Sequence, residues 1–375
     1  MIPLHKPFLE EDDKKVLLET IDSGVIYSGG SVENSFLREL KDYFGVEYAI
    51  AVPSGTAALE LAVASLNLKQ DDEVIVPSFT FPSDATAILN QGATVKFAEI
   101  DPVYFNIDPE SIKKQLSPKT KAIIAVHYAG MSCQMDQIMQ IAKKAGIKII
   151  EDASHGWGSR YKGKLLGTIG DIGCFSLHAT KNITSGEGGI FITNSKKIFR
   201  KAEIYRQVGT NRYDFLQKKI RKYQWVSRGS SYYLSGLQSA IARNQLKKIN
   251  KITQDRKNIA QLYLEFLGGI KEVVLPQLPS ECDPNWHIFA ILVSSRKRDQ
   301  LIEFMKSKDI ETAFHYTPLH SSKMGRKLGY KKSDFKITNT VADSILRLPI
   351  YPGLKESDIK FIASKFKKFF KNLTK

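Results

Sequence analysis

The stretch KAIIAVHYAGMSCQMDQIMQIAKKAGIKIIED (121–152) decides the fold. KAIIAVH (121–127) and IKIIED (147–152) are apolar runs that predict buried strands, and the amphipathic stretch Met135–Ala145 between them predicts a helix. A strand, a helix and a second strand in this order form the unit from which parallel sheets are built. This stretch therefore predicts two neighbouring parallel strands joined by a helix.

The same alternation continues on both sides of this unit. Further strand-like runs are YAIAV (48–52), EVIVP (73–77), TVKFAEI (94–100) and IGCFSL (172–177). Further helix-like stretches are Ala57–Leu66, Asp84–Leu89 and Pro109–Leu116, several of them with Ser, Thr or Asp near the start. Alternation over more than 100 residues predicts an α/β fold whose mostly parallel sheet has helices on both faces.

The pattern changes near Gln245. A long charged helix is predicted over Gln245–Leu267, followed by shorter elements that include NWHIFAILV (285–293) and RDQLIEFMKSK (298–308). A chain of 375 residues is also too long for one ordinary core. We therefore predict a large α/β domain over 1–245, with the N-terminal segment at the domain boundary, and a smaller α+β domain over 246–375.

Composition narrows the class of protein. The apolar fraction of 42% and the charged fraction of 25% are typical of a soluble protein. No apolar run approaches the roughly 18 residues that a membrane span needs, and MIPLHKPFLEEDDKK (1–15) lacks the apolar stretch of a signal peptide. We therefore expect a cytoplasmic protein without a membrane partner. The three cysteines are far apart and form no CxxC pair, which argues against a disulfide framework and a zinc site.

The net charge is strongly positive. Lys+Arg minus Asp+Glu is 55 − 39 = +16. Most of the excess is lysine spread over helical segments such as Lys247–Lys251 and Lys365–Lys371, which indicates a lysine-rich surface. A weak attraction for a diphosphate-bearing substrate is the second interpretation. Nucleic acid is not expected as a partner, because no recognisable binding motif accompanies the charge.

Chemically useful residues follow several predicted strands, at the sheet edge where open α/β folds bind ligands. Ser54-Gly55-Thr56 opens a helix, whose N-terminus suits a phosphate, although such a sequence is often only a helix cap. Asp152 closes a buried strand and is either a capping carboxylate or the group that keeps a pyridine nitrogen protonated. His155 lies close by and is either structural or in contact with that ring.

Lys181 lies in FSLHATKNITSGEGG (175–189), a polar, glycine-rich segment just past a strand. Ser176 stands five residues upstream, where its hydroxyl can reach a phosphate, and the GEGG run permits close approach of the backbone. A lysine buried near a cationic ring has the lowered pKa that imine chemistry requires. This setting singles out Lys181 among the many lysines.

Four motifs resemble those of one family: SGTAAL (54–59), PSFTFPSDA (77–85), EDASHGWGS (151–159) and the Lys181 segment. Together they closely resemble the DegT/StrS-type nucleotide-sugar aminotransferases. The resemblance runs from IPLHKPFL (2–9) to RLPIYPGL (347–354). It implies a fold-type I enzyme dependent on pyridoxal 5'-phosphate, with a nucleotide sugar and an amino acid as substrates and a homodimer that shares its active sites.

The resemblance also implies roles for individual residues. Lys181 is the catalytic lysine that forms the Schiff base with the cofactor, and Asp152 pairs with the pyridinium nitrogen. Matches to the other cofactor-binding positions are Gly55, Thr56 and Ser176 for the phosphate, and Phe81 and His155 beside the ring. Ser231 stands where relatives have an asparagine that reaches the neighbouring subunit's cofactor, with Tyr233 in place of an arginine.

His315 and Tyr316, in AFHYTPLH (313–320), are candidates for the substrate pocket, with ordinary packing as the alternative. A finer branch of the family is also resembled, in five segments: VHYAGMSCQMD (126–136), GTIGDIGCFSLHATKN (167–182), GTNRYDF (209–215), YQWVSRGSSYYLSGLQSA (223–240) and AFHYTPLHSS (313–322). That branch transfers an amine from L-glutamate to dTDP-4-keto-6-deoxy-D-glucose, forming dTDP-4-amino-4,6-dideoxy-D-galactose for surface polysaccharide such as O-antigen. Equatorial amination at C4, giving the dideoxyglucose isomer, and amination at C3 of an isomeric keto-sugar both remain open.

Two hypotheses from outside this enzyme class make different predictions. A non-catalytic pyridoxal-phosphate binder would lack a competent lysine or carry an added DNA-binding segment. A basic nucleic-acid-binding protein would be retained on DNA in a salt-sensitive manner. Lys181 argues against the first hypothesis and against the dehydratase relatives that carry a histidine in its place.

Overall fold

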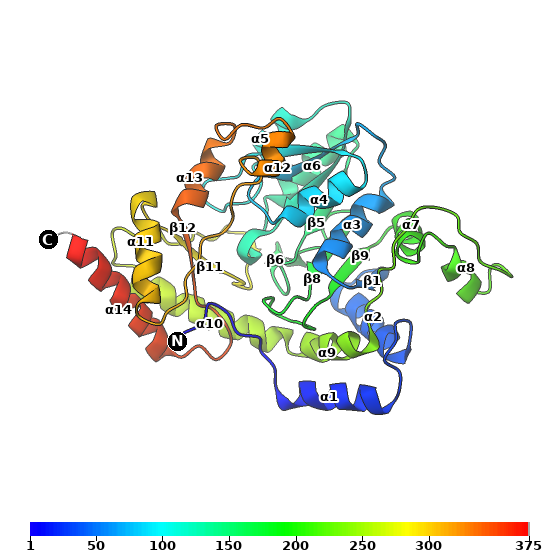
Figure 1. Ribbon diagram of the computed structural model, residues 1–375, viewed down its shortest axis with the longest axis horizontal. Coiled ribbons are helices and arrows are strands. Elements are labelled where there is room, and N and C mark those ends of the chain that lie inside the picture. Colours follow the sequence, from blue (N-terminus) through cyan, green and yellow to red (C-terminus); the bar gives the residue numbers. More distant parts are fainter. Residues whose placement is uncertain (374–375) are drawn as a thin grey trace.

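The computed structural model describes residues 1–373, which are built around a central seven-stranded sheet (Figure 1). Its strands are β1 (Tyr48–Val52), β2 (Glu73–Pro77), β3 (Thr94–Ala98), β4 (Thr120–Val126), β5 (Lys148–Asp152), β8 (Ile172–Ser176) and β9 (Gly189–Thr193). The spatial order is β1-β9-β8-β5-β4-β2-β3. The neighbours from β3 to β8 are parallel, and β9 runs antiparallel to both β8 and β1. The predicted mostly parallel α/β sheet is confirmed.

Both faces of the sheet are buried, because successive strand residues point to opposite sides. In β4, Ile123 packs into an apolar cluster on one face, while Ile124 packs into a second cluster on the other. Ile149 and Ile150 of β5 divide in the same way. The helices of this part supply many of the other residues of both clusters. They are α2 (Ser31–Phe44), α3 (Gly55–Ser65), α4 (Pro82–Asn90), α5 (Pro109–Gln115), α6 (Met135–Ala145), α7 (Lys196–Arg206) and α9 (Gly236–Lys247).

The C-terminal part (residues 249–373) has its own apolar cluster, in which Tyr263, Phe289 and Phe366 are fully buried. Its strands β11 (Phe289–Leu292) and β12 (Ile345–Leu348) form an antiparallel pair. Its helices are α10 (Ile249–Leu267), α11 (Ser295–Lys306), α12 (Lys323–Lys327), α13 (Lys336–Ser344) and α14 (Glu356–Leu373). Figure 1 shows this part beside the sheet, with α10 and α14 along one side.

Several connections join the two parts. The chain begins on the C-terminal part, where Ile2 pairs with Ile310, and then forms α1 (Glu11–Asp22), which packs against α9. Strand β10 (Cys282–Asp283) joins β6 (Arg160–Tyr161) and β7 (Lys164–Leu165) in a small sheet. The short 3-10 helix η1 (Tyr128–Gly130) follows β4 and contributes to the C-terminal cluster.

Two features differ from the sequence prediction. The helix predicted over 245–267 is in fact two helices, α9 and α10, which meet at Lys248. Strand β9 was not foreseen, since its sequence GIFIT directly follows the glycine-rich run that is typical of a loop. The division predicted at 245/246 remains a prediction; it falls within α9, just before this junction. No helix among residues 1–373 is long and apolar enough to cross a membrane.

Candidate active site

Two of the predicted site residues, Asp152 and Ser176, lie at the carboxyl ends of neighbouring strands. β5 ends at Asp152 and β8 ends at Ser176, and these strands are parallel neighbours. Lys181 follows Ser176 by five residues, and its backbone N–H donates to His178 O at 2.8 Å. The buried Trp157 donates from Nε1 to Ser176 O at 2.9 Å, which fixes the end of β8.

The phosphate-suited residues form a cradle around the N-terminus of α3. Ser54 caps this helix, accepting the N–H of Ala57 at 3.1 Å. A Cβ at Gly55 would lie 2.8 Å from Ser176 Cβ, so glycine alone lets the helix approach the end of β8 this closely. The Thr56 hydroxyl lies 2.6 Å from that of Ser83, in the first turn of α4. The predicted residues Gly55, Thr56 and Ser176 thus meet at a helix N-terminus, where backbone N–H groups favour an anion.

The side-chain amine of Lys181 has a lowered pKa. Burial lowers its pKa to about 8, opposed by the negative charge of Asp152 and assisted by the positive charge of Arg347. A lysine with this pKa is partly neutral near pH 7, which a nucleophile or base requires.

Two carboxyl groups, Asp152 and Asp84, stand near each other, and Asp152 acts on the lysine. Asp152 is buried and accepts the Ser154 N–H at 2.9 Å. Asp84 is fully buried, and burial together with the charge of Asp152 raises the pKa of Asp84 well above its usual range. Thr80 donates to Asp84 Oδ2 at 2.6 Å. Asp84 therefore adds little negative charge next to Asp152.

A group of buried histidines lines the site. The rings of His155 and His287 lie 4.5 Å apart, and His155 Nδ1 accepts the Ala129 N–H at 3.3 Å. Burial, with the charge of Lys181 among the lesser causes, lowers the pKa of His155 well below its usual value. Burial likewise lowers the pKa of His287, whose Nδ1 lies 2.8 Å from Asn182 Oδ1. Both rings are thus neutral near pH 7.

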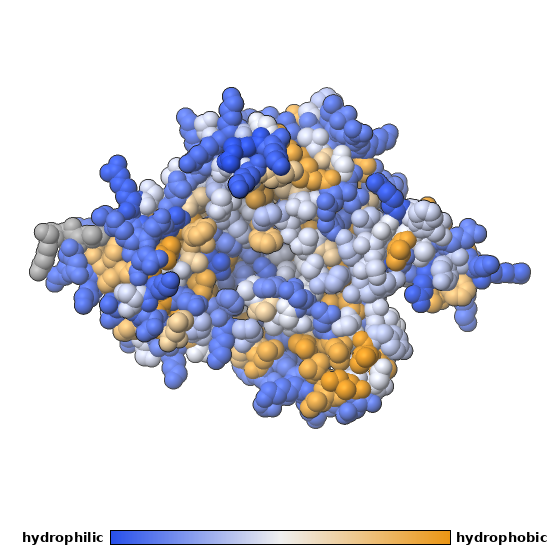
Figure 2. Space-filling model, in the orientation of Figure 1, coloured by the Kyte–Doolittle hydropathy of each residue, from blue (hydrophilic) through white to orange (hydrophobic). Residues whose placement is uncertain are grey.

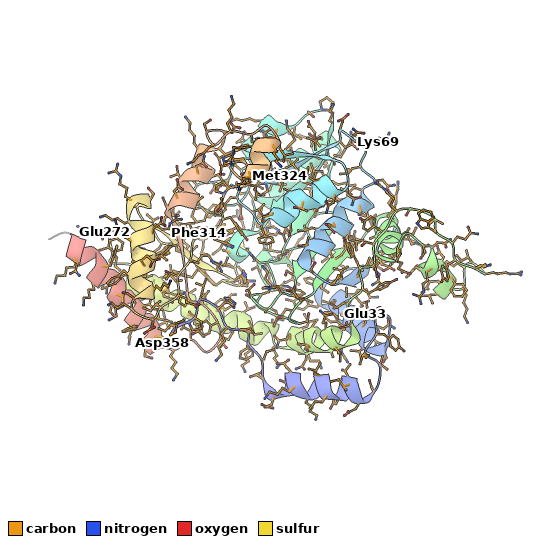
Figure 3. The ribbon with its side chains drawn as sticks, in the orientation of Figure 1. Glu33, Lys69, Glu272, Phe314, Met324 and Asp358 are labelled. Carbon is orange, nitrogen blue, oxygen red and sulfur yellow. The ribbon has the colours of Figure 1, made fainter. Side chains whose placement is uncertain are left out.

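The segment of the C-terminal part that carries His315 and Tyr316 lies beside the same site. The ring of His315 lies 6.2 Å from that of His155, and the ring of Tyr316 lies 6.5 Å from that of Phe81. Burial, then the charges of Arg347 and Lys181, lower the pKa of His315 to about 2. The structure thus brings His315 and Tyr316 to the predicted cofactor residues. Phe314, labelled in Figure 3, is exposed and lies 5.4 Å from the Arg298 guanidinium.

Ser231 has a different setting. It is exposed, and its backbone pairs with Gln207 at the root of a projecting arm (residues 207–231) that includes α8 (Arg212–Leu216) (Figure 1). Next to it, the ring of Tyr233 lies 5.4 Å from the Arg206 guanidinium, which also pairs with Glu203 at 3.0 Å. Tyr233 thus helps to hold the root of the arm on α7.

Sequence reasoning missed several residues of the site. Asp84, His287 and Arg347 were given no role, although each lies within a segment that the motifs or strand predictions had included. Asn285 was also missed; its Nδ2 donates to the carbonyl oxygens of His155 and Trp157 at 2.8 and 2.7 Å. Arg347 alone had a readable signal, because it is a charged residue inside the apolar run ILRLPI (345–350).

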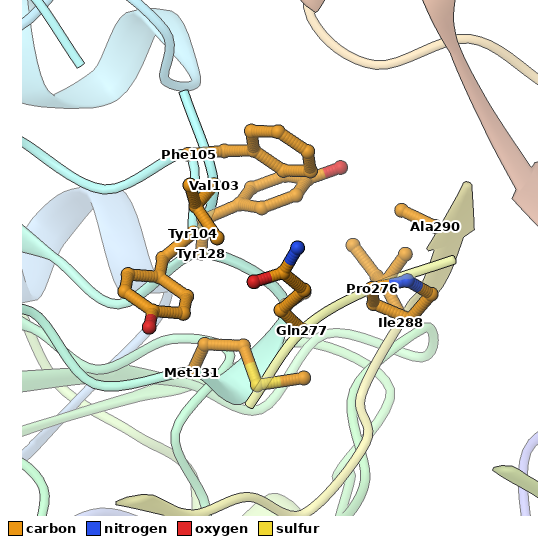
Figure 4. Close-up of a pocket in the computed structure, with 10 residues that line it drawn as sticks. Val103, Tyr104, Phe105, Tyr128, Met131, Pro276, Gln277, Ile288 and Ala290 are labelled. Carbon is orange, nitrogen blue, oxygen red and sulfur yellow. The ribbon is translucent and has the colours of Figure 1, made fainter. Parts of the chain in front are cut away.

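A separate hollow adjoins the site through Tyr128 (Figure 4). It lies between the two parts of the chain and is lined by Val103, Tyr104, Phe105, Tyr128, Ala129, Met131, Pro276, Gln277, Ile288 and Ala290. None of these side chains is charged at neutral pH. The hollow thus offers neither a base nor an amine, and the chemistry lies with Lys181.

The sequence matches the DegT/DnrJ/EryC1/StrS aminotransferase family over residues 7–367. The chain belongs to this family. It is 32% identical to the GDP-perosamine synthase of Vibrio cholerae over 372 residues, 99% of each chain. Its fold matches Helicobacter pylori PseC, an aminotransferase of pseudoaminic acid biosynthesis, with a TM-score of 0.92, 27% identity and 99% of each chain covered. It also matches the PLP form of a putative sugar aminotransferase, Spr1654, from Streptococcus pneumoniae, with a TM-score of 0.91, 25% identity and 98% of each chain covered.

The family defines the reaction class and the cofactor. This chain is a sugar aminotransferase that depends on pyridoxal 5'-phosphate (PLP) and takes a nucleotide sugar and an amino donor. The site described above fits that cofactor: a half-buried amine of lowered pKa, a buried carboxylate beside it and a helix N-terminus that only a glycine lets approach.

Proposed function

We propose that this sugar aminotransferase transfers the amino group of L-glutamate to C4 of dTDP-4-keto-6-deoxy-D-glucose. The product is dTDP-4-amino-4,6-dideoxy-D-galactose, for surface polysaccharide biosynthesis such as that of O-antigen. The observation that carries the transaminase chemistry is Lys181, a half-buried amine with a pKa of about 8 next to Asp152. The choice of sugar rests on the resemblance of GTNRYDF (209–215) and the GSSY segment (229–232) to the branch that makes this product.

The proposed roles follow from the positions of the side chains. When bound, PLP supplies a carbonyl that takes up the amino group and a ring that withdraws electrons from the substrate carbon. Lys181 would hold the cofactor through Nζ, and its amine, when free, would move the proton at the donor Cα. Asp152 holds a proton on the ring nitrogen, which maintains the electron withdrawal.

The remaining residues position the cofactor and the substrate. Gly55, Thr56 and Ser176 hold the phosphate at the start of α3, and Phe81 and His155 pack beside the ring. His315 and Tyr316 line the substrate pocket. Ser231 reaches the neighbouring subunit's cofactor in a homodimer, from the exposed root of the arm. The cytoplasmic location expected from the sequence remains a prediction.

The nucleotide and the product configuration have competitors. The GDP-perosamine synthase relative, named for a GDP-linked amino sugar, favours a GDP-linked keto-sugar as the second candidate. Equatorial amination at C4 and amination at C3 also compete with the proposed reaction. The face on which the proton is returned to the sugar carbon decides between an axial and an equatorial amine.

The test is to incubate the PLP-loaded protein with L-glutamate and dTDP-4-keto-6-deoxy-D-glucose and to determine the product by NMR. We expect an axial amine at C4 and formation of 2-oxoglutarate. The GDP-linked 4-keto sugar and the 3-keto isomer are run in parallel. An equatorial amine, or faster turnover of either parallel substrate, would refute the proposed product. A Lys181→Ala variant that still turned over normally would refute the catalytic role of Lys181.

A further inference from the structure

Arg347 is fixed in the wall of the site. It lies on β12 between the buried residues Leu346 and Leu348, and it pairs with Ala290 of β11. On its other side, the backbone N–H of Arg347 donates to Ala313 O at 2.7 Å. These two pairings fix its position next to the segment that carries His315 and Tyr316.

The guanidinium of Arg347 is not matched by an acid. None of the ion pairs formed within residues 1–373 includes it, and its buried Nε has no hydrogen-bond partner there. In the segment paired with Arg347 through Ala313, Thr312 Oγ1 and His315 Nδ1 are also buried without a partner within that range. Native proteins rarely leave buried polar atoms unsatisfied, so three in neighbouring segments indicate a place where a polar ligand binds.

The charge of Arg347 acts on the reacting groups. After burial, its charge contributes to the lowered pKa values of Lys181, His155 and His315, and its strand pairs with the segment that carries His315. An unpaired cation next to a catalytic amine is unfavourable unless an anion joins it. A substrate anion close to the reacting carbon fits this requirement.

The two substrates differ at that carbon. In an amino-acid donor, the carbon that bears the amine also bears a carboxylate. In a 4-keto sugar, the neighbours of C4 are neutral ring carbons, and the diphosphate is attached to C1. A planar guanidinium also matches a carboxylate with two parallel hydrogen bonds. An anion-binding group beside Lys181 thus suits the donor.

We propose that Arg347 binds the α-carboxylate of the amino donor and so determines the affinity for the donor without serving the sugar. This assignment rests on the proposed function, since it takes L-glutamate as the donor. It explains how one pocket accepts two unlike substrates in turn: the donor binds through Arg347, and the sugar binds through other contacts.

The two half-reactions separate these roles. Arg347→Gln and Arg347→Lys are compared with wild type and with Arg296→Gln, the same change at an exposed position in the first turn of α11. PLP-loaded protein is mixed with L-glutamate, and protein loaded with pyridoxamine phosphate is mixed with the keto-sugar, each followed by stopped-flow absorbance. For Arg347→Gln we expect the donor half-reaction to lose about 10- to 100-fold in kcat/KM, the effect of one charge-assisted hydrogen-bonded pair. The sugar half-reaction should change less than about twofold.

Equilibrium binding gives a second readout. 2-Oxoglutarate carries the same carboxylate but no amine, so it binds PLP-loaded protein without reacting. Its dissociation constant, measured by calorimetry, should rise by a similar factor in Arg347→Gln and less in Arg347→Lys, which keeps the charge. Arg296→Gln should match wild type in all three measurements.

Three outcomes would overturn the assignment. Equal losses in both half-reactions would give Arg347 a structural role, and a loss confined to the sugar would make it a diphosphate contact. Unchanged binding of 2-oxoglutarate would show that Arg347 does not bind the α-carboxylate. If melting curves show that Arg347→Gln does not fold, Arg347→Lys decides by the same ratio of half-reactions. If wild type rejects glutamate, the proposed donor is wrong; the comparison is then made with the amino acid it accepts, since every such donor carries an α-carboxylate.

Discussion

At the scale of single residues, burial sets the chemistry of Lys181. Its pKa of about 8 leaves about a quarter of the amine neutral at pH 7.5, against about 0.1% for an ordinary lysine. Only the neutral amine attacks the aldehyde of PLP. We therefore expect the rate at which cofactor-free protein captures PLP to rise with pH up to about 8 and to level off above it. Absorbance after rapid mixing at a series of pH values measures this rate.

The control for this experiment is Lys181→Ala, which should show no covalent capture at any pH. A wild-type rate that continues to rise about tenfold per pH unit up to pH 10 would contradict the lowered pKa. Lys181 and Asp152 were readable from the sequence because each lies in a linear motif. Asp84 and His287 were not, since their environments exist only after distant segments pack together.

At the scale of elements, the approach of α3 to β8 forms the phosphate cradle. In Gly55→Ala the new Cβ would lie 2.8 Å from Ser176 Cβ and 3.2 Å from its Cα, so helix and strand must separate. Overpacking of this kind typically costs about 1–3 kcal/mol. We expect PLP affinity to fall by about tenfold or more, measured by equilibrium titration of cofactor-free protein. Gly269→Ala is the control, because its Cβ meets open space; equal affinities in the two variants would refute the cradle.

The elements also show where sequence reasoning stops. β1, β2 and α6 have the predicted bounds, because hydrophobic periodicity and turn residues define such elements locally. β9 was missed because its five residues adjoin a glycine run, and its antiparallel direction depends on pairing with β1 and β8. Likewise the end of α9 and the whole of α10 were predicted as one helix, since nothing in the local pattern marks the break at Lys248. Tertiary packing therefore determines both β9 and the break between α9 and α10.

At the scale of the whole molecule, large apolar side chains are exposed in two places on the surface. Figure 2 shows an apolar patch over α1 and the loop that follows, where Leu18, Ile21 and Ile26 are exposed. On the arm, Trp225 is 78% exposed, with Val226 exposed beside it. Large apolar side chains gathered at the surface mark interaction sites. Both surfaces support the proposed homodimer.

The arm gives the sharper test of the homodimer, because Ser231 lies at its root. Trp225→Asp places a charge where an aromatic anchor would be buried, and in a twofold-symmetric dimer the change occurs twice. We expect the dimer dissociation constant to rise at least about 100-fold, measured by sedimentation velocity over a range of protein concentrations. Met324→Asp, which changes an exposed methionine on α12, is the control and should leave the dimer intact.

If Ser231 contacts the neighbouring cofactor, the monomeric variant also binds PLP more weakly than wild type does. A Trp225→Asp protein that stays dimeric at low concentration would remove the arm from the interface and, with it, the shared cofactor site.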